Sequence, residues 1–564
     1  MSGVALRPPG QVMRLARMGS SHACRLSFMR VLLRRLAREN WRFDRPAWNI
    51  DARGVGHAVY TAHGPTRSYS LVAFAHDLPA EQRSDRVIAE AWDATFTLFD
   101  GVPDESDIAR LAKNVPLQEA GRISEAELSL SRANRSVRLW SHVVDELAAG
   151  RQPEQSEIDA VGYLMRTTAV YGSGKFGAAD RETIAGRPEF AAPFQVEMLS
   201  VYLTRAFVRD LVEHMARARG YEKAVPLDEP LAERLGIGNS TGLGMAPFLI
   251  NHPVLLNNWI AAREMALARV RALKRVSGAE RAIFDEMLAR AEISVAQWRS
   301  QHPIQLEKLA DLTADMKALG DHLDTADLTG DAPWDALYRW AQTTLSLEGQ
   351  ELLVCLMLEP YGPLVDDLAE AMSAGESIAR RIDGAMSLGA LRLLIEEHYD
   401  WALSVDWTAR ESIARAWYVS EEKLEPRLGE RFEEPIEDYE QPLAPGRDAA
   451  SLWDTLSSWP EDETVGRFLL CHPEHRHILR RVQTIAKASY GEIRDNTIGA
   501  GVLPIDMLRC KLAFFGAVHF DPRSDRWVRI SMYRGAPYPQ TLSLENADFW
   551  SYPARADTEK GTTP

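Results

Sequence analysis

The chain has 564 residues, of which 46% are hydrophobic and 26% are charged, and its formal net charge is −15 at pH 7. These values are typical of a globular protein with several domain-sized cores, and they exclude a largely disordered chain. The acidic balance also argues against nucleic acid as the main partner.

Cysteine usage and apolar runs indicate the compartment. The four cysteines form no CxxC pair, which excludes a zinc ribbon or a thioredoxin motif and fits a reducing compartment. The longest apolar run, 352–358, has seven residues, far fewer than a membrane-spanning helix needs. Arginine outnumbers lysine 55 to 10, as is common in proteins from GC-rich bacterial genomes. The sequence therefore predicts a soluble, cytoplasmic bacterial protein with no membrane partner.

The N-terminus is the one strongly basic region. Residues 1–53 contain eleven arginines, no lysine and three acidic residues, a local charge of +8. A basic, acid-poor start of this kind resembles a transit peptide. The alternative is an ordinary basic helix over 24–40 that follows a ragged start over residues 1–20.

Period-two alternation follows this basic region. In residues 56–63 and 67–76, apolar and polar side chains alternate, and both stretches are rich in Val, Tyr, Phe and Ser. The two stretches are separated by Gly-Pro-Thr, and together they predict a β-hairpin. Residues 94–99 predict a third strand. We therefore interpret 21–103 as a small α+β unit.

Helical periodicity dominates residues 104–420. Apolar spacing predicts helices over 125–149 and 154–168, and a helix over 193–219 that is apolar on nearly every face. A helix of the last kind is usually buried at the centre of a large domain. Further helices are predicted at 254–274, 279–299, 304–318, 334–359, 364–372 and 388–403.

An acidic connector over 421–448 precedes a C-terminal α+β unit over 449–564. Within this unit the sequence predicts helices at 449–458 and 473–490 and a hairpin over 511–533, with strands at 511–520 and 526–533. The predicted fold class is mainly α: a large multi-helix body with small α+β elements, the β-hairpins, near the N- and C-termini.

The stretch 236–247, Gly-Ile-Gly-Asn-Ser-Thr-Gly-Leu-Gly-Met-Ala-Pro, is the main candidate binding loop. Glycine and small polar residues suit a loop whose N–H groups bind phosphate or carboxylate. Part of the same frame recurs at 496–504. The candidate ligand-binding residues are Asn239, Ser240, Thr241, Gly242 and Gly244 in the first copy and Asn496, Gly499 and Gly501 in the second. The alternative is that both stretches are plain turns between helices.

A third glycine-rich stretch, 171–177, contains Gly172, Gly174 and Lys175 and precedes Arg181. It fails the P-loop spacing, and a predicted helix rather than a strand precedes it, which argues against a dinucleotide fingerprint. Lys175 and Arg181 are candidate anion contacts. Alternatively, the glycines end a helix and the lysine is solvated.

Three residues in or directly before predicted helices are candidates for chemistry. His252 stands beside the main glycine stretch, before Pro253, and is the candidate general acid or base. Capping of the next helix is nevertheless the first explanation of a His-Pro pair. Glu197 and Arg205 lie in the most apolar helix, where charges are paired or functional. Glu197 is the second candidate catalytic residue, with Arg205 as its buried charge partner.

The sequence favours an enzyme of small-molecule metabolism that binds an anionic substrate or cofactor, bearing phosphate or carboxylate, on its glycine-rich loops. It identifies no cofactor, no reaction type and no metal-ligating set. The partner we expect is a small anionic molecule, with a homo-oligomer as a possible assembly. The alternative is a noncatalytic helical scaffold or regulatory protein, which predicts exposed apolar grooves instead of a polar cavity.

Overall fold

The computed structural model describes most of the chain. The described residues are 4–79, 92–117, 123–167, 184, 186–241, 249–250, 252–298, 303–326, 328, 330–370, 372, 381–409, 419–420, 423–424, 445–494, 504–517, 519–522, 528–551 and 553. Statements about the structure below refer to these residues.

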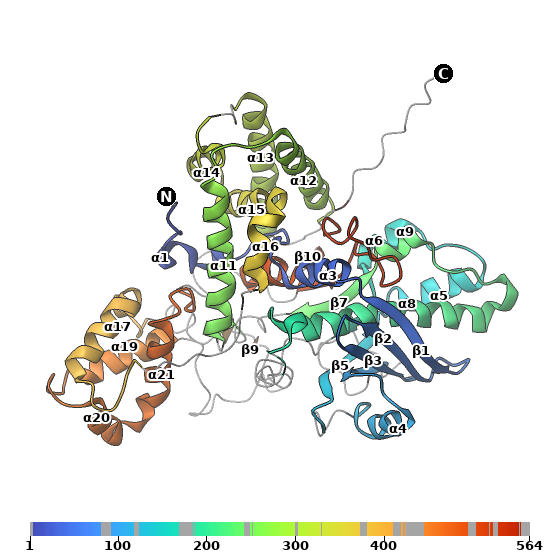
Figure 1. Ribbon diagram of the computed structural model, residues 1–564, viewed down its shortest axis with the longest axis horizontal. Coiled ribbons are helices and arrows are strands. Elements are labelled where there is room, and N and C mark those ends of the chain that lie inside the picture. Colours follow the sequence, from blue (N-terminus) through green and yellow to red (C-terminus); the bar gives the residue numbers. More distant parts are fainter. Residues whose placement is uncertain are drawn as a thin grey trace.

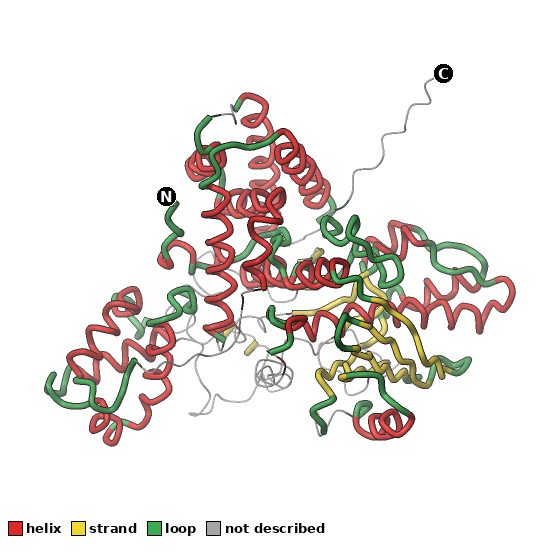
Figure 2. Tube along the Cα trace, in the orientation of Figure 1, coloured by secondary structure: helices red, strands yellow, loops and turns green. Residues whose placement is uncertain are grey.

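One nine-stranded sheet organises the described chain (Figures 1 and 2). Among the described strands all neighbours are antiparallel except β6 and β7, which are parallel. The strand order is β1 (Arg42–Ile50), β2 (Gly56–His63), β3 (Ser68–Ala75), β4 (Ala94–Asp100), β5 (Glu127–Arg135), β6 (Tyr163–Thr167), β7 (Gly236–Thr241), β11 (Val528–Met532) and β10 (His519–Pro522). A separate two-stranded sheet pairs β8 (Val419–Ser420) with β9 (Lys423–Leu424).

The predicted fold class, mainly α with small terminal hairpins, is wrong. The strands expected near the two termini belong to one sheet, and β5, β6 and β7 join them from the region that was predicted to be helical. The hairpin formed by β2 and β3 and the third strand β4 are confirmed.

Three local predictions fail for the same reason. The predicted helix 125–149 is strand β5 followed by α5 (Trp140–Ala148), and the predicted helix 154–168 is α6 (Gln155–Val161) followed by β6. The predicted strand 511–520 is instead helical over its first half, as the end of α22 (Pro504–Phe515). In each case the chain changes element inside an apolar stretch, where periodicity alone cannot separate strand from helix.

Helix α8 (Gln195–Gly220) packs across one face of the sheet, and α5 and α3 (Phe28–Arg38) pack against it. It carries seventeen buried residues on all sides, which confirms the prediction of a central, all-round apolar helix. The opposite face of the sheet is covered by α4 (Glu105–Asn114), whose Leu111 packs with Val72 and Leu130 in a smaller core.

A helical layer extends the main core away from the sheet (Figure 1). Its centre is α15 (Leu347–Leu358), in which ten of twelve residues are buried. The helices of this layer are α11 (Pro253–Arg271), α12 (Gly278–Ala296), α13 (Pro303–Thr325), α14 (Pro333–Thr344), α15 and α16 (Gly362–Glu370), with the short α1 (Pro9–Val12) and α2 (Leu15–Met18) beside it. The short α9 (Glu229–Glu233) instead contacts α8. A second helical group has its own apolar core and comprises α17 (Leu388–Leu403), α19 (Pro445–Leu456), α20 (Val465–Cys471) and α21 (Arg476–Ile485).

The N-terminal segment, for which the sequence predicted a ragged basic start over 1–20, packs among these helices from Arg7 onwards. Arg7 is 4% exposed, and its guanidinium donates to Glu264 on α11 and to Glu351 on α15, both at 2.7 Å. Arg30 forms a second buried pair with Glu359, whose two carboxylate oxygens lie 2.6 and 2.7 Å from its nitrogens. Arginines of this segment therefore bind the start of the chain to the helical layer.

Candidate functional site at the carboxyl ends of β6 and β7

The parallel pair β6 and β7 creates a distinctive edge of the sheet. Thr167, the last residue of β6, is in register with Asn239 near the end of β7, so both strands end at the same edge. In sheets with parallel strands, ligands bind outside the carboxyl ends of those strands. This edge is therefore the first place to search for a site.

A buried lysine reaches this edge from another part of the chain. Lys511 on α22 is 0% exposed, and its Nζ donates to Oδ1 of Asn239 at 2.7 Å. The amide of Asn239 in turn donates from Nδ2 to the carbonyl oxygen of Thr167 at 3.0 Å. Because both ends of the amide are engaged, the Asn239 side chain is fixed and holds the amine in place.

Burial lowers the pKa of Lys511 well below its usual value of 10.5, because the charged ammonium loses hydration inside the protein. Burial thus favours the neutral amine form of the side chain, which has a lone pair that an ammonium lacks. A lysine in this state serves as a base or a nucleophile. The geometry thus presents a basic nitrogen at the carboxyl ends of β6 and β7.

The glycines that begin the main predicted loop have a packing role. A Cβ atom on Gly238 would lie 2.5 Å from Cγ of the Tyr163 ring, and one on Gly236 would lie 2.3 Å from the carbonyl oxygen of Met532. These glycines allow β7 to fit between β6 and β11. Residues 236–241 are consequently a strand, where the sequence had predicted a loop between helices.

The structure places the predicted ligand-binding residues unequally. Asn239 lies in the buried cluster, while Ser240 and Thr241 follow it on β7 and their side chains are not described. The remaining candidates lie outside the described residues: Gly172, Gly174, Lys175, Arg181, Gly242, Gly244, Asn496, Gly499 and Gly501. Their segments, 168–183, 242–248 and 495–503, directly follow β6, directly follow β7 and directly precede α22.

His252 is half-buried and occupies the N-cap position of α11, with Pro253 as the first helical residue. This is the arrangement that the capping alternative predicted, although the His252 side chain itself makes no capping hydrogen bond. The catalytic role of His252 stays a prediction.

Glu197 and Arg205 do not form the buried pair that the sequence suggested. They are eight residues apart on α8, about 12 Å along the helix axis. Arg205 donates to backbone carbonyls, including those of Leu235 at 2.7 Å and Ala536 at 2.6 Å, and its guanidinium lies 4.0 Å from the centre of the Tyr538 ring. Arg205 therefore joins α8 by hydrogen bonds to the backbone just before β7 and just after β11. Glu197 is half-buried on the first turn of α8, and its catalytic role also stays a prediction.

Sequence reasoning missed Lys511, although a signal was present. The lysine stands in the apolar run Cys-Lys-Leu-Ala-Phe-Phe, 510–515, in a chain with only ten lysines. A charged residue inside such a run is unusual, since lysine is almost never fully buried unless it is paired. The run was interpreted as the beginning of the first strand of the hairpin 511–533, with Lys511 as its first residue.

Comparison with known proteins gives no family for this chain. No family model matches it, and no curated protein or solved structure is significantly similar to it. In addition, no described helix has the length and apolarity that crossing a membrane requires. The functional argument therefore rests on the geometry above.

Proposed function

We propose that the protein is an enzyme of small-molecule metabolism that binds an anionic substrate, bearing phosphate or carboxylate, at the carboxyl ends of β6 and β7. Lys511 is the group that accepts a proton there, and Asn239 positions its amine. A bacterial cytoplasmic location, expected from the composition, belongs to the same proposal.

One observation carries the proposal. Three glycine-containing stretches were singled out from the sequence as anion-binding loops, and they are separated by tens to hundreds of residues. The three elements to which they connect, β6, β7 and α22, meet at the hydrogen bonds that join Thr167, Asn239 and Lys511. Segments selected for their composition are thus adjacent in sequence to the elements that hold a buried amine.

The chemistry of the amine suits an anionic substrate. A negative charge beside Lys511 raises the pKa of the amine, because it stabilises the ammonium form that burial disfavours. Binding therefore favours uptake of a proton by Lys511, and we propose that the substrate donates it. General-base catalysis of this kind typically contributes about 10²–10⁴-fold in rate.

The test is a ligand screen followed by substitution of the amine. The wild-type protein and Lys511→Met are screened by thermal shift against sugar phosphates, acyl-CoAs, nucleotides and carboxylates. A ligand present at about 100 times its dissociation constant stabilises the protein by about 2.7 kcal/mol. We expect a selective ligand for the wild type that the variant binds more weakly and fails to convert. Lys487→Met is the matched control, because Lys487 is exposed.

Two results would contradict the proposal. If no compound of the panel raises the melting temperature and partner proteins co-purify, the alternative of a noncatalytic scaffold protein would be supported instead. A ligand that Lys511→Met binds and converts like the wild type would remove Lys511 from the site.

A further inference from the structure

Two of the four cysteines meet in the main core. Cys24 lies in the loop 19–27, between α2 and α3, and Cys355 lies on α15. The sulfur of Cys355 is 3.9 Å from the carbonyl oxygen of His22, 333 positions earlier in the chain, and its thiol is in hydrogen-bond contact with that of Cys24. The fold therefore brings together two thiols from distant parts of the sequence.

This contact makes the two thiols chemically unequal. The hydrogen bond with Cys355 lowers the pKa of Cys24, and the charge of Arg263 acts in the same direction, although burial opposes both. The same hydrogen bond and burial together raise the pKa of Cys355. Since the thiolate is the nucleophilic form of cysteine, Cys24 is the sulfur that reacts first with an oxidant.

The loop that holds Cys24 can shift relative to α15. None of the residues 19–27 belongs to a helix or a strand, and the contacts of the loop with α15 include a bond to a side chain, from the backbone N–H of Ser21 to Glu348 at 3.2 Å. Loops open locally at a lower free energy than packed helices do, whereas α15 is fixed by the burial of ten of its twelve residues. Motion of the loop therefore allows the sulfurs to reach the narrow geometry of a disulfide.

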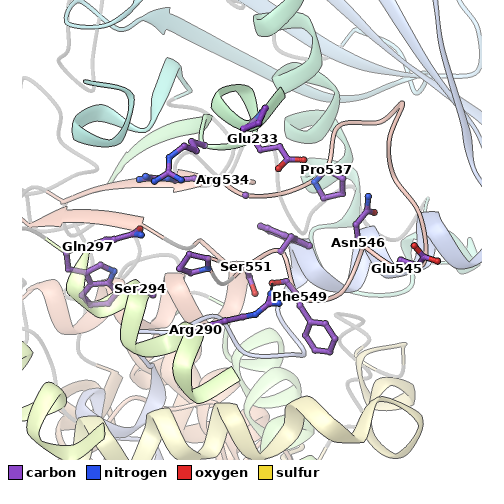
Figure 3. A pocket seen from close by; sticks show the side chains of 16 residues that line it. Glu233, Arg290, Ser294, Gln297, Arg534, Pro537, Glu545, Asn546, Phe549 and Ser551 are labelled. Atoms are coloured by element: carbon purple, nitrogen blue, oxygen red, sulfur yellow. Dashed lines mark hydrogen bonds between the residues drawn. The ribbon is translucent and has the colours of Figure 1, made fainter. Parts of the chain in front are cut away.

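A cleft of about 510 Å³ brings solvent close to this loop (Figure 3). Trp298 lines the cleft, and its ring stacks on that of His22 with the ring centres 6.1 Å apart. His22 precedes Cys24 by two residues and contacts Cys355 through its carbonyl oxygen. Cys24 and Cys355 are themselves 0% and 1% exposed. An opening of the loop at His22 would therefore connect the two thiols to the cleft.

We propose that Cys24 and Cys355 are a site of reversible modification, at which hydrogen peroxide joins them in an intramolecular disulfide. The sulfur of Cys24 attacks the O–O bond of the peroxide, which gives a sulfenic acid and one water molecule. The sulfur of Cys355 then attacks this sulfur, the S–S bond forms, and a second water molecule leaves. The two thiols lose two electrons and two protons, and one peroxide molecule is reduced to two water molecules.

The disulfide would fasten the N-terminal segment to the helical layer. A Cβ on Gly19, in the same loop, would lie 2.4 Å from the backbone carbonyl carbon of Arg509 on α22, so the loop contacts both α15 and α22. A cross-link that closes a long loop restricts the unfolded chain and thereby stabilises the folded protein. We therefore expect the oxidised protein to melt at a higher temperature than the reduced protein.

Oxidation of the full-length protein in native buffer, followed by mass mapping, tests the proposal. The protein is treated overnight with hydrogen peroxide, denatured, blocked with iodoacetamide and digested without reduction. We expect the peptide of Cys24 linked to that of Cys355 to be the main linked species, and dithiothreitol to release it. Cys355→Ala should form no such link and show no rise in melting temperature on oxidation. Cys510→Ala is the matched control, because Cys510 is also buried, and it should form the link as the wild type does.

Mapping of the wild type alone is enough to overturn the proposal. Free thiols at both Cys24 and Cys355, after a treatment that has oxidised the exposed Cys471, would do so. Links from Cys24 to Cys510 or Cys471 in comparable amounts would show that the native contact does not direct pairing. A link that forms only in urea, or a melting temperature that falls on oxidation, would show that the folded protein does not accommodate the bond.

Discussion

Replacing Arg7 with methionine tests whether the N-terminal segment stabilises the helical layer. Arg7 is 4% exposed, and it donates to Glu264 at 2.7 and 2.8 Å and to Glu351 at 2.7 and 3.3 Å. Both glutamates are 1% exposed. Arg7→Met keeps most of the side-chain volume but leaves these carboxylates without four charge-assisted hydrogen bonds.

The magnitude follows from what remains around the two carboxylates. Breaking a buried ion pair by removing one partner typically costs about 3–5 kcal/mol. Arg263 still lies 3.1 Å from Glu264, and Arg17 lies 3.4 Å from Glu351. Because these two guanidinium groups still offset the negative charge, we expect the low end of the range, a loss of about 3 kcal/mol.

The loss should also depend on pH. Burial raises the pKa of Glu264, but the charges and hydrogen bonds of Arg7 and Arg263 outweigh burial and lower it below its usual value of 4.5. Stabilisation by a carboxylate with a lowered pKa is present above the unfolded-state pKa and disappears as the pH falls through the folded-state pKa. The difference between Arg7→Met and the wild type should therefore shrink below about pH 4.5.

Urea unfolding followed by tryptophan fluorescence, at pH 7 and at pH 4, measures both effects. Arg219→Met is the control, because Arg219 and its partner Asp145 are 46% and 64% exposed, and exposed pairs contribute about 0–1 kcal/mol. A loss for Arg7→Met no larger than that of the control, or equal at the two pH values, would refute the reasoning.

Three further predictions concern the sheet and the buried amine. Gly238→Ala places a Cβ about 2.5 Å from the Tyr163 ring and should cost about 1–3 kcal/mol in urea unfolding, while Gly278→Ala, with open space around it, should cost nothing. Arg205→Met removes the donors to several buried carbonyls and should cost about 1–3 kcal/mol by the same assay. In the wild type, the lowered pKa of Lys511 makes stability rise with pH up to about 10.5. The stability advantage of Lys511→Met over the wild type should therefore be larger at pH 7 than at pH 10, and an equal advantage would contradict a neutral amine.

The sequence predicted elements well where one kind of periodicity was uninterrupted. Helix α8 and the hairpin β2–β3 are examples, because an all-round apolar helix and a clean alternation each have one interpretation. The prediction missed strands β5 and β6 because both faces of the sheet are covered there. Every residue of β6 is buried, and such a strand has no alternation to distinguish it from a helix. Gly162, with φ of +76°, ends α6, and this glycine was the feature of the sequence that marked the change from helix to strand.

The candidate site was partly accessible to sequence reasoning. Composition identified the glycine-rich stretches and Asn239, since glycine and small polar residues have local consequences. The strand β7 was not predictable, because Gly-Ile-Gly-Asn-Ser-Thr has low β-propensity and becomes a strand only between β6 and β11. Nor was the contact between Asn239 and Lys511, which joins positions 272 residues apart and depends on the tertiary fold.

The arginines near the start of the chain have a consequence for the order of biosynthesis. Arg25 binds Asp548 with a nitrogen–oxygen distance of 2.9 Å, and the two residues are 523 positions apart. At about 5–20 residues per second, a ribosome needs roughly 0.5–2 min to add the residues between them. During that time Arg25 is already part of the growing chain, whereas its partner Asp548 has not yet been synthesised. The pairs with the helical layer, such as Arg25 with Asp366, can therefore form earlier in synthesis than the pair with Asp548.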